Sequence, residues 1–231
     1  MEVENEKKGF LNKPIPVLYQ DKQYIVFNKP AGLLVVPTPQ NELNTLLRIV
    51  NHQYGSGKNL EKLYPCHRLD RETSGVILFA KGAEHQEAMM KLFKNRLIKK
   101  KYIAFVQGRL RRPTGDLRST IADQTDKKFN KHAQGKLAVT KYKVQQLKKH
   151  YTVVEVEPIT GRTNQIRIQF SQIGNPLVGD RKFSFARDFD LKFRRTALHA
   201  QSLECKNPIT QHVINVTAPL PEDMEVFLAR N

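Results

Sequence analysis

The sequence contains no tryptophan and only two cysteines, Cys66 and Cys205. Two cysteines are too few for a disulfide framework and match no metal-binding spacing, so we expect two reduced thiols in a cytoplasmic protein. The seven histidines are scattered along the chain, and no metal site is expected. No apolar run has transmembrane length, and no Lys/Arg-rich start precedes a hydrophobic signal segment. The sequence therefore predicts a soluble, unexported protein that is not membrane-bound.

Acidic residues are also scarce. The 231 residues include 22 Asp and Glu against 39 Lys and Arg, a net charge of +17. Such an excess favours a polyanionic partner, with nucleic acid first and an acidic membrane surface second. With 39% hydrophobic residues, the chain is long enough to bury the core of one large domain.

The positive charge is concentrated in one segment. Residues Lys91 to His150 hold 18 Lys and Arg against 3 Asp, which is +15 of the total +17. One interpretation is a solvated face that keeps the protein soluble, and the other is a face that binds the phosphates of RNA. On the second interpretation, the candidate RNA contacts in this segment are Lys99, Lys100, Arg112, Lys127 and Lys128.

Several common sites are missing. The "GSGKN" stretch at residues 55–59 lacks the upstream Gly and the Ser/Thr after the Lys that a phosphate-binding loop requires, so a turn is expected there. There is no Gly-x-Ser-x-Gly elbow and no cluster of carboxylates. A metal-dependent nuclease is therefore disfavoured.

The hydrophobic pattern mixes helices and strands without a βαβ rhythm. Alternation and turn residues predict two short strands around a Pro-Gly turn in 23–37, a strand at 101–108, and a hairpin of 137–147 with 151–158, which favours antiparallel pairing. Two further strands are expected at 198–205 and 212–219. Helical spacing predicts helices at 43–55, 83–98, 163–174 and 223–230, the third capped by Thr163.

Five motifs occur in order along the chain. They are "NKPAGLLVVP" (28–37), "HRLDRETSG" with "AKG" (67–82), "KKYIAFVQG" (100–108), "GRTNQIRIQF" with "IGNPLVGD" (161–180) and "RTALHAQSL" (195–203). Together they resemble the motifs of the RluA family of RNA pseudouridine synthases. The resemblance implies an α+β fold with a central mixed, mostly antiparallel sheet, flanking helices and a catalytic cleft.

The family resemblance also implies the chemistry. These enzymes detach uracil from its ribose, rotate it and rejoin it through carbon-5 without a cofactor, in ribosomal or transfer RNA. Asp70 matches the essential carboxylate, which acts either as nucleophile or as base, and Arg167 matches the guanidinium that keeps it ionised. Tyr102 matches the tyrosine that lies against the target base. Arg68 matches the arginine that fills the gap left by the flipped uridine, although a phosphate clamp is an equal alternative, and Arg71 beside it is a further candidate RNA contact.

The departures from the family pattern are informative. Asn164 stands where the family usually has His, and Asn cannot carry charge, so we expect no acid or base role there. We expect a loose tail at residues 1–13 and one catalytic domain at 14–231, without the small N-terminal RNA-binding domain of many relatives. The protein is expected to be a monomer. A catalytically silent RNA-binding protein is the main alternative, and Asp70, Tyr102 and Arg167 together disfavour it.

Overall fold

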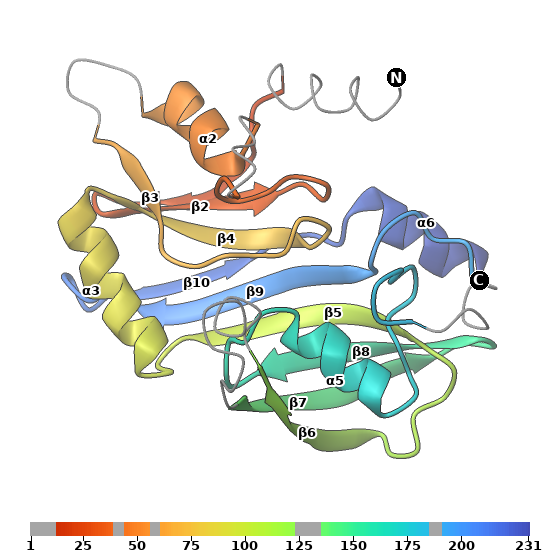
Figure 1. The fold of residues 1–231 in the computed structure, drawn as a ribbon. Helices are drawn as coiled ribbons and strands as arrows, with labels where there is room; N and C mark the ends of the chain where they lie inside the picture. Colours follow the sequence, from red (N-terminus) through yellow and green to blue (C-terminus); the bar gives the residue numbers. More distant parts are fainter. Residues whose placement is uncertain (1–12, 39–43, 56–60, 123–134, 185–190) are drawn as a thin grey trace. The chain divides into compact units, whose positions relative to one another are not determined.

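The computed structural model describes residues 13–38, 44–55, 61–122, 135–184 and 191–231 (Figure 1). The chain divides into two compact units, one within residues 1–98 and 200–219 and the other within 99–199 and 220–231. The described helices are α2 (Leu46–Tyr54), α3 (Ala83–Lys94), α5 (Gln165–Gln172) and α6 (Glu222–Arg230). The expected α+β class is confirmed.

The first unit is built on antiparallel strands. Their order is β1-β2-β4-β9, with β3 paired to β4 and β10 paired to β9. The strands are β1 (Val17–Gln20), β2 (Tyr24–Lys29), β3 (Leu63–Pro65), β4 (Ser74–Lys81), β9 (Leu198–Lys206), which begins just before this unit, and β10 (Val213–Thr217). Strands β2 and β4 are buried along nearly their whole length. Continuous burial of this kind marks strands that are covered on both faces.

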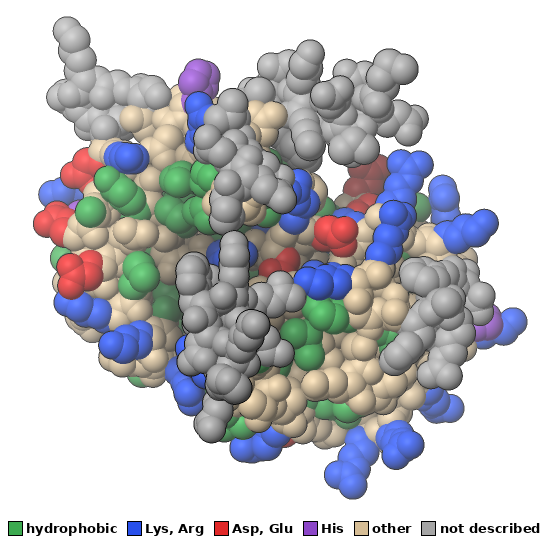
Figure 2. Space-filling model, in the orientation of Figure 1, with side chains coloured by type: hydrophobic (Ala, Val, Ile, Leu, Met, Phe, Trp, Pro, Cys, Tyr) green, Lys and Arg blue, Asp and Glu red, His purple; other side chains and the backbone are tan. Residues whose placement is uncertain are grey.

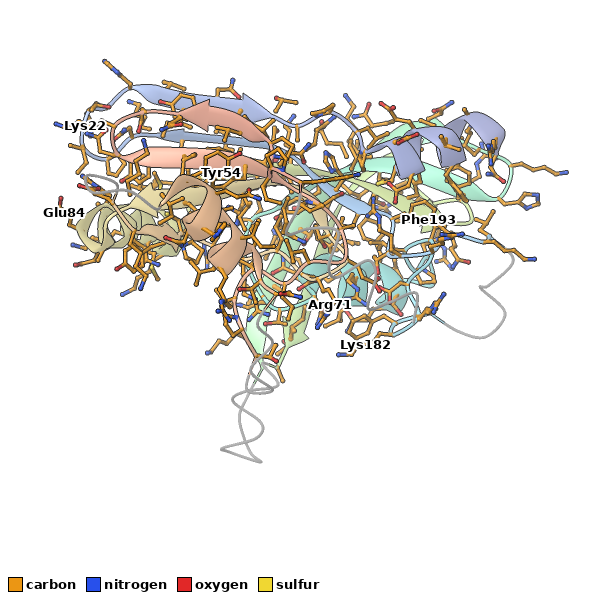
Figure 3. All side chains as sticks on the ribbon, turned by 90° about the horizontal axis from the view of Figure 1, so that it is seen from above. Lys22, Tyr54, Arg71, Glu84, Lys182 and Phe193 are labelled. Carbon is orange, nitrogen blue, oxygen red and sulfur yellow. The ribbon has the colours of Figure 1, made fainter. Side chains whose placement is uncertain are left out.

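Helices cover the strands of this unit. Met89 of α3 is fully buried in a core with Leu78 of β4 and Leu203 of β9. On α2, Tyr54 (labelled in Figure 3) packs its ring 5.4 Å from that of Phe27, and its hydroxyl donates a hydrogen bond of 2.7 Å to the Ile15 carbonyl. The helix is thereby attached both to β2 and to the segment before β1.

The second unit contains an antiparallel sheet of order β5-β8-β7-β6. Its strands are β5 (Lys99–Gln107), β6 (Thr114–Ile121), β7 (Lys136–Leu147) and β8 (Tyr151–Pro158). Helix α6 packs Met224 and Phe227 against Phe105 and Tyr151 on one face of the sheet. Helix α5 packs on the other face, where the Phe170 ring lies 5.7 Å from that of Tyr142.

Three local predictions were wrong. Residues 33–37 form no strand, because the carbonyls of Leu34 and Val35 accept the N–H groups of Leu46 and Leu47 and so cap the start of α2. The helix predicted for 83–98 ends at Lys94. Helix α5 begins at Gln165 rather than after a Thr163 cap. In addition, strands β1, β3 and β6 were not predicted.

The hairpin of β7 and β8 is confirmed, as are strands β5, β9 and β10 and helices α2 and α6, within a few residues of the expected bounds. Cys66 and Cys205 are free and buried. Burial raises the pKa of the Cys66 thiol and raises that of Cys205 to about 11. Thiols with raised pKa values are poor nucleophiles, so both cysteines are core residues. None of the helices in the described ranges is long and apolar enough to cross a membrane.

Candidate functional site

Asp70 lies in the loop between β3 and β4, partly exposed, and its backbone is held from several directions. The Asp70 carbonyl accepts the N–H of Thr73 at 3.1 Å, which closes a turn. The neighbouring Arg71 carbonyl accepts the N–H of Gly32 at 2.9 Å. Thr73 and Leu69 are buried on either side of the turn. The loop is therefore anchored through its main chain, which leaves the side-chain position of Asp70 well defined.

Lys29 is the strongest anchor of this loop. Its side chain is fully buried, and Nζ donates hydrogen bonds to the carbonyls of Pro30 (2.9 Å), Leu33 (2.7 Å) and Arg71 (3.1 Å). Three acceptors use three N–H bonds, so the amine is an ammonium ion. Lys29 therefore ties the "NKPAG" loop to the loop of Asp70. Sequence reasoning missed this role, although a lysine at the end of an otherwise apolar strand was a signal for it.

His67 fixes the start of the same loop. Its Nε2 accepts the Leu78 N–H at 3.0 Å, and its ring lies 4.9 Å from that of Phe93. Because Nε2 accepts a hydrogen bond, a neutral ring carries its proton on Nδ1. His67 therefore completes the hydrogen bonding of β4 where β3 has ended, and this is a structural role.

Gly75 is required by a close approach of the backbone. Its φ is +107°, and a Cβ placed there would lie 2.1 Å from the Ala200 carbonyl oxygen. We expect Gly75→Ala to lower the free energy of unfolding by at least about 2 kcal/mol, because it adds both backbone strain and a steric clash. Urea denaturation would measure this loss. Gly161→Ala is the matched control, since its Cβ meets nothing within 4 Å, and an equal loss in both variants would contradict this account.

Tyr102 and Lys100 lie on the same side of β5, because side chains two residues apart in a strand share a face. Tyr102 is 9% exposed. Lys100 is partly buried, and desolvation lowers the pKa of its ammonium group. Lys99, in contrast, is exposed on the other face. The two lysines, which the sequence gave no means to separate, therefore differ in environment.

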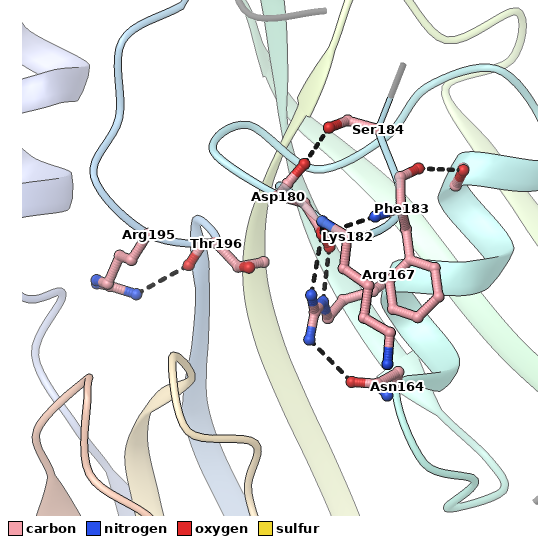
Figure 4. Close-up of polar contacts among 9 residues, drawn as sticks. Asn164, Arg167, Asp180, Lys182, Phe183, Ser184, Arg195 and Thr196 are labelled. Carbon is pink, nitrogen blue, oxygen red and sulfur yellow. Dashed lines mark hydrogen bonds and ion pairs between the residues drawn. The ribbon is translucent and has the colours of Figure 1, made fainter. Parts of the chain in front are cut away.

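Arg167 is held by two side chains (Figure 4). Its Nε and Nη2 donate to Oδ2 and Oδ1 of Asp180 at 2.6 and 2.9 Å, and its Nη1 donates to Oδ1 of Asn164 at 2.8 Å. The guanidinium also lies 5.0 Å from the centre of the Phe183 ring. A two-pronged contact with a carboxylate fixes both the position and the plane of a guanidinium.

Asp180 is the buried partner of this ion pair. Its side chain has no exposed surface, and Oδ1 also accepts the N–H groups of Lys182 and Phe183 at 2.9 and 3.0 Å. Burial alone would raise the pKa of Asp180, but the hydrogen bonds and charge of Arg167 and the two amides outweigh it and lower the pKa. Gly179, with φ of +75°, allows the turn before Asp180 to pass against the Arg195 carbonyl.

Asn164 has a left-handed backbone, with φ of 55° and ψ of 22°, at the N-terminal end of α5. Asn adopts this conformation more readily than most residues. Its side chain makes no cap hydrogen bond to the helix and instead accepts from Arg167. The sequence signal for Asn164 was its departure from the family pattern, but its contact with Arg167 was not foreseen.

The other candidate RNA contacts differ in what can be said of them. Arg68, Arg71, Lys99 and Arg112 are exposed, as phosphate contacts must be, and their role stays a prediction. Lys127 and Lys128 lie outside the described residues. Asp70 belongs to the first unit, and Tyr102 and Arg167 belong to the second. Within the described ranges, no three His, Cys, Asp or Glu side chains gather in a way that could hold a metal ion.

Part of the positive charge in the segment 91–150 is balanced by acids across the sheet. Lys141 of β7 lies opposite Glu157 of β8 and Asp116 of β6. Lys143 lies opposite Glu155, which also forms an ion pair of 3.0 Å with Lys101. Residues directly opposite each other share a face of the sheet. This face is therefore closer to the solvated interpretation than to a phosphate-binding one.

Comparisons with known proteins agree with the motifs. The family model for RNA pseudouridylate synthase matches residues 23–172. The chain is 32% identical over 215 residues to the uncharacterized RNA pseudouridine synthase YhcT of Bacillus subtilis, covering 91% of this chain and 70% of the relative. It is 32% identical over 242 residues to ribosomal large subunit pseudouridine synthase D of Haemophilus influenzae, covering 99% and 74%.

A solved structure shares the fold. Human RNA pseudouridylate synthase domain containing 4 superposes with a TM-score of 0.75 at 24% identity, covering 99% of this chain and 96% of the human one. At that identity the likeness establishes the fold alone. The family model and the relatives establish more: this chain belongs to the RluA family of RNA pseudouridine synthases and is an isomerase that acts on RNA.

Proposed function

We propose that this enzyme converts uridine to pseudouridine in large-subunit ribosomal RNA, with Asp70 as the essential carboxylate and Tyr102 and Arg167 acting on the same nucleotide. The observation that carries the proposal is the anchored Asp70 loop, which the buried Lys29 ammonium and the Thr73 amide hold through the main chain. A carboxylate that must meet one sugar atom needs such a fixed support. The substrate is proposed from the relatives named for the ribosomal large subunit.

The proposed reaction needs no cofactor. Asp70 attacks the sugar carbon or removes a sugar proton, uracil leaves, turns and rejoins through carbon-5, and a proton is lost from carbon-5. The Tyr102 ring stacks on the base, and its hydroxyl assists that final proton transfer. Arg167 favours the ionised state of Asp70.

The target uridine must leave its stack to reach a carboxylate on the enzyme. We propose that the exposed Arg68 takes the place of the flipped base, with a phosphate contact as the alternative role, and that the exposed Arg71 binds the backbone nearby. An enzyme that modifies ribosomal RNA works in the cytoplasm, and we propose that it acts as a monomer.

The experiment is to incubate the purified protein with unmodified transcripts of large-subunit ribosomal RNA and of transfer RNAs, in a buffer containing a metal chelator, and to map pseudouridines. We expect modification at defined uridines of the ribosomal transcript. Modification of transfer RNA alone would redirect the substrate, and RNA binding without any pseudouridine would support the silent binding protein instead.

The contact between Asn164 and Arg167 changes what should be expected from Asn164→His. A neutral imidazole can accept from Arg167 through one ring nitrogen, whereas an imidazolium cannot and would face the guanidinium and the nearby Lys182. We therefore expect near-normal turnover above pH 7.5 and a loss as the pH falls through about 6.5, the ordinary His pKa. The measurement is the pH dependence of turnover at saturating RNA, with the wild type, which has Asn at this position, as control. Coincident pH profiles would show that this hydrogen bond has no influence on the reaction.

A further inference from the structure

A small open recess lies where β6 ends and β7 begins, beside the turn that precedes α5. Its empty volume is about 300 Å³, open solvent included, and it is lined by Ile121, Lys136, Gly161, Arg162 and Thr163. None of these five residues is acidic, and two are cationic. Gly161 leaves its side of the recess open, since a Cβ there would meet nothing within 4 Å.

Arg162 provides the main cationic group of the recess. Its Nε donates a long hydrogen bond of 3.4 Å to the Leu137 carbonyl. Among the described residues, no carboxylate pairs with Arg162 and no acceptor binds its two terminal nitrogens. The side chain is partly buried, so its charge is less screened than that of a fully exposed arginine. A guanidinium with two unused donor groups in a recess is suited to a two-pronged contact with an oxyanion.

The turn that presents Arg162 is braced from inside the fold by Gln165. This side chain is buried, and its Oε1 accepts from the Arg162 N–H at 3.0 Å and from the Thr160 hydroxyl at 2.6 Å. Its Nε2 donates to the Val139 carbonyl at 3.0 Å and to the Thr140 hydroxyl at 2.7 Å. The side-chain amide is thus fully used, and the backbone of the recess is ordered before any ligand arrives.

The recess differs from the opposite face of the same sheet. On that face Lys141 lies across from Glu157, and Lys143 lies across from Glu155. Each of these lysines therefore already has an acid beside it, whereas the lining of the recess brings two cations together without one. In Figure 2, Lys and Arg side chains project from the lower part of the view, where Figure 1 places β6 and β7. The recess identifies which of the cations in this region are arranged for an anion.

We propose that this recess is a binding site for a phosphate of the RNA backbone, with Arg162 making the two-pronged contact and Lys136 adding charge beside it. The inference rests on the proposed function, because it assumes that RNA is the substrate. Phosphate contacts carry no sequence information but fix the position of the strand on the protein. The site would therefore raise affinity and orient the RNA without taking part in the chemical step.

The test uses Arg162→Gln and Lys136→Gln in the full chain, with affinity for an unmodified large-subunit ribosomal RNA transcript measured across a salt series. We expect each substitution to weaken binding and to reduce the slope of log affinity against log salt by about 0.7 to 0.9. Lys143→Gln is the matched control, a lysine of the same strand that lies opposite Glu155, and its slope should equal that of the wild type. Thermal unfolding of each variant shows whether the fold is kept, and Arg162→Lys replaces Arg162→Gln if it is not.

Three results would overturn the proposal. One is a salt slope that is unchanged in both Arg162 and Lys136 variants. The second is a fall in single-turnover rate at saturating RNA with unchanged affinity, which would make Arg162 part of the chemistry. The third is an Arg162-dependent site for inorganic phosphate that has no effect on RNA affinity. Each can occur while the wild type still makes pseudouridine and Asp70→Asn does not, so failure of this inference is distinguishable from failure of the proposed function.

Discussion

Asp70→Asn should abolish pseudouridine formation while leaving the RNA affinity and the unfolding temperature close to those of the wild type. The substitution keeps the shape of the side chain and removes the ionised oxygen that either proposed role requires. Loss of a group that acts directly on the reacting atoms costs several orders of magnitude, so we expect a fall of at least about 1,000-fold in the single-turnover rate. The fold should persist because the loop is held through its main chain, by Lys29, Gly32 and Thr73.

The control for this experiment is Glu72→Gln, which neutralises the other carboxylate of the same loop. It should leave the rate within a few-fold of the wild type, since the proposal gives Glu72 no chemical role. If Asp70→Asn retained a near-normal rate, the assignment of the essential carboxylate would be wrong. If Glu72→Gln were equally inactive, the effect would reflect the charge of the loop rather than one reacting oxygen.

The sequence predicted the reacting residues better than their supports. The motif around Asp70 was evident because its residues are contiguous and strongly patterned. The role of Lys29 depends on its reach to the Arg71 carbonyl, 42 positions further along the chain. Hydrophobic periodicity reports which face of an element is buried, but it carries no information on which distant carbonyl a buried amine will meet.

The same limit explains the local errors in the fold. Residues 33–37 have the composition of a strand, yet the backbone of Leu34 and Val35 is used to cap α2. Strand β6, which begins "TGDLRSTI", has too few apolar residues to be recognised, and its pairing with β7 supplies the order that its composition lacks. Tertiary contacts outweigh local propensity in both cases.

Charge patterning was informative at one scale only. The count over residues 91–150 indicated an excess of +15, but not that Lys101, Lys141 and Lys143 would each lie beside an acid in the folded sheet. Strand register decides which lysines are balanced. Arg162, outside that segment, was not a candidate on charge count and becomes one only when the recess is seen.

Arg167→Met should lower the free energy of unfolding by about 3 to 5 kcal/mol, because it leaves the buried Asp180 carboxylate without its cation. From the sequence, the carboxylate expected to be stranded was Asp70, whereas the structure identifies Asp180 as a partner of Arg167. We expect the double variant Arg167→Met/Asp180→Asn to recover part of this stability, since the uncompensated charge is then removed. Activity should not return, because the guanidinium proposed to assist Asp70 is still missing.

Asp180→Asn alone separates support of Arg167 from overall stability. The native pKa of Asp180 is lowered from its ordinary value of 3.8, so its carboxylate stabilises the fold above that value, and this stability is lost as the pH falls through the native pKa. Urea denaturation should therefore show a deficit for Asp180→Asn at pH 7 that shrinks below about pH 4. The turnover of this variant at saturating RNA should fall more than its half-saturation concentration rises, because a loosened Arg167 affects the reaction and not RNA capture. Strictly additive losses in the double variant would contradict the coupling between Arg167 and Asp180, and a deficit that is independent of pH would assign the stability to shape rather than to charge.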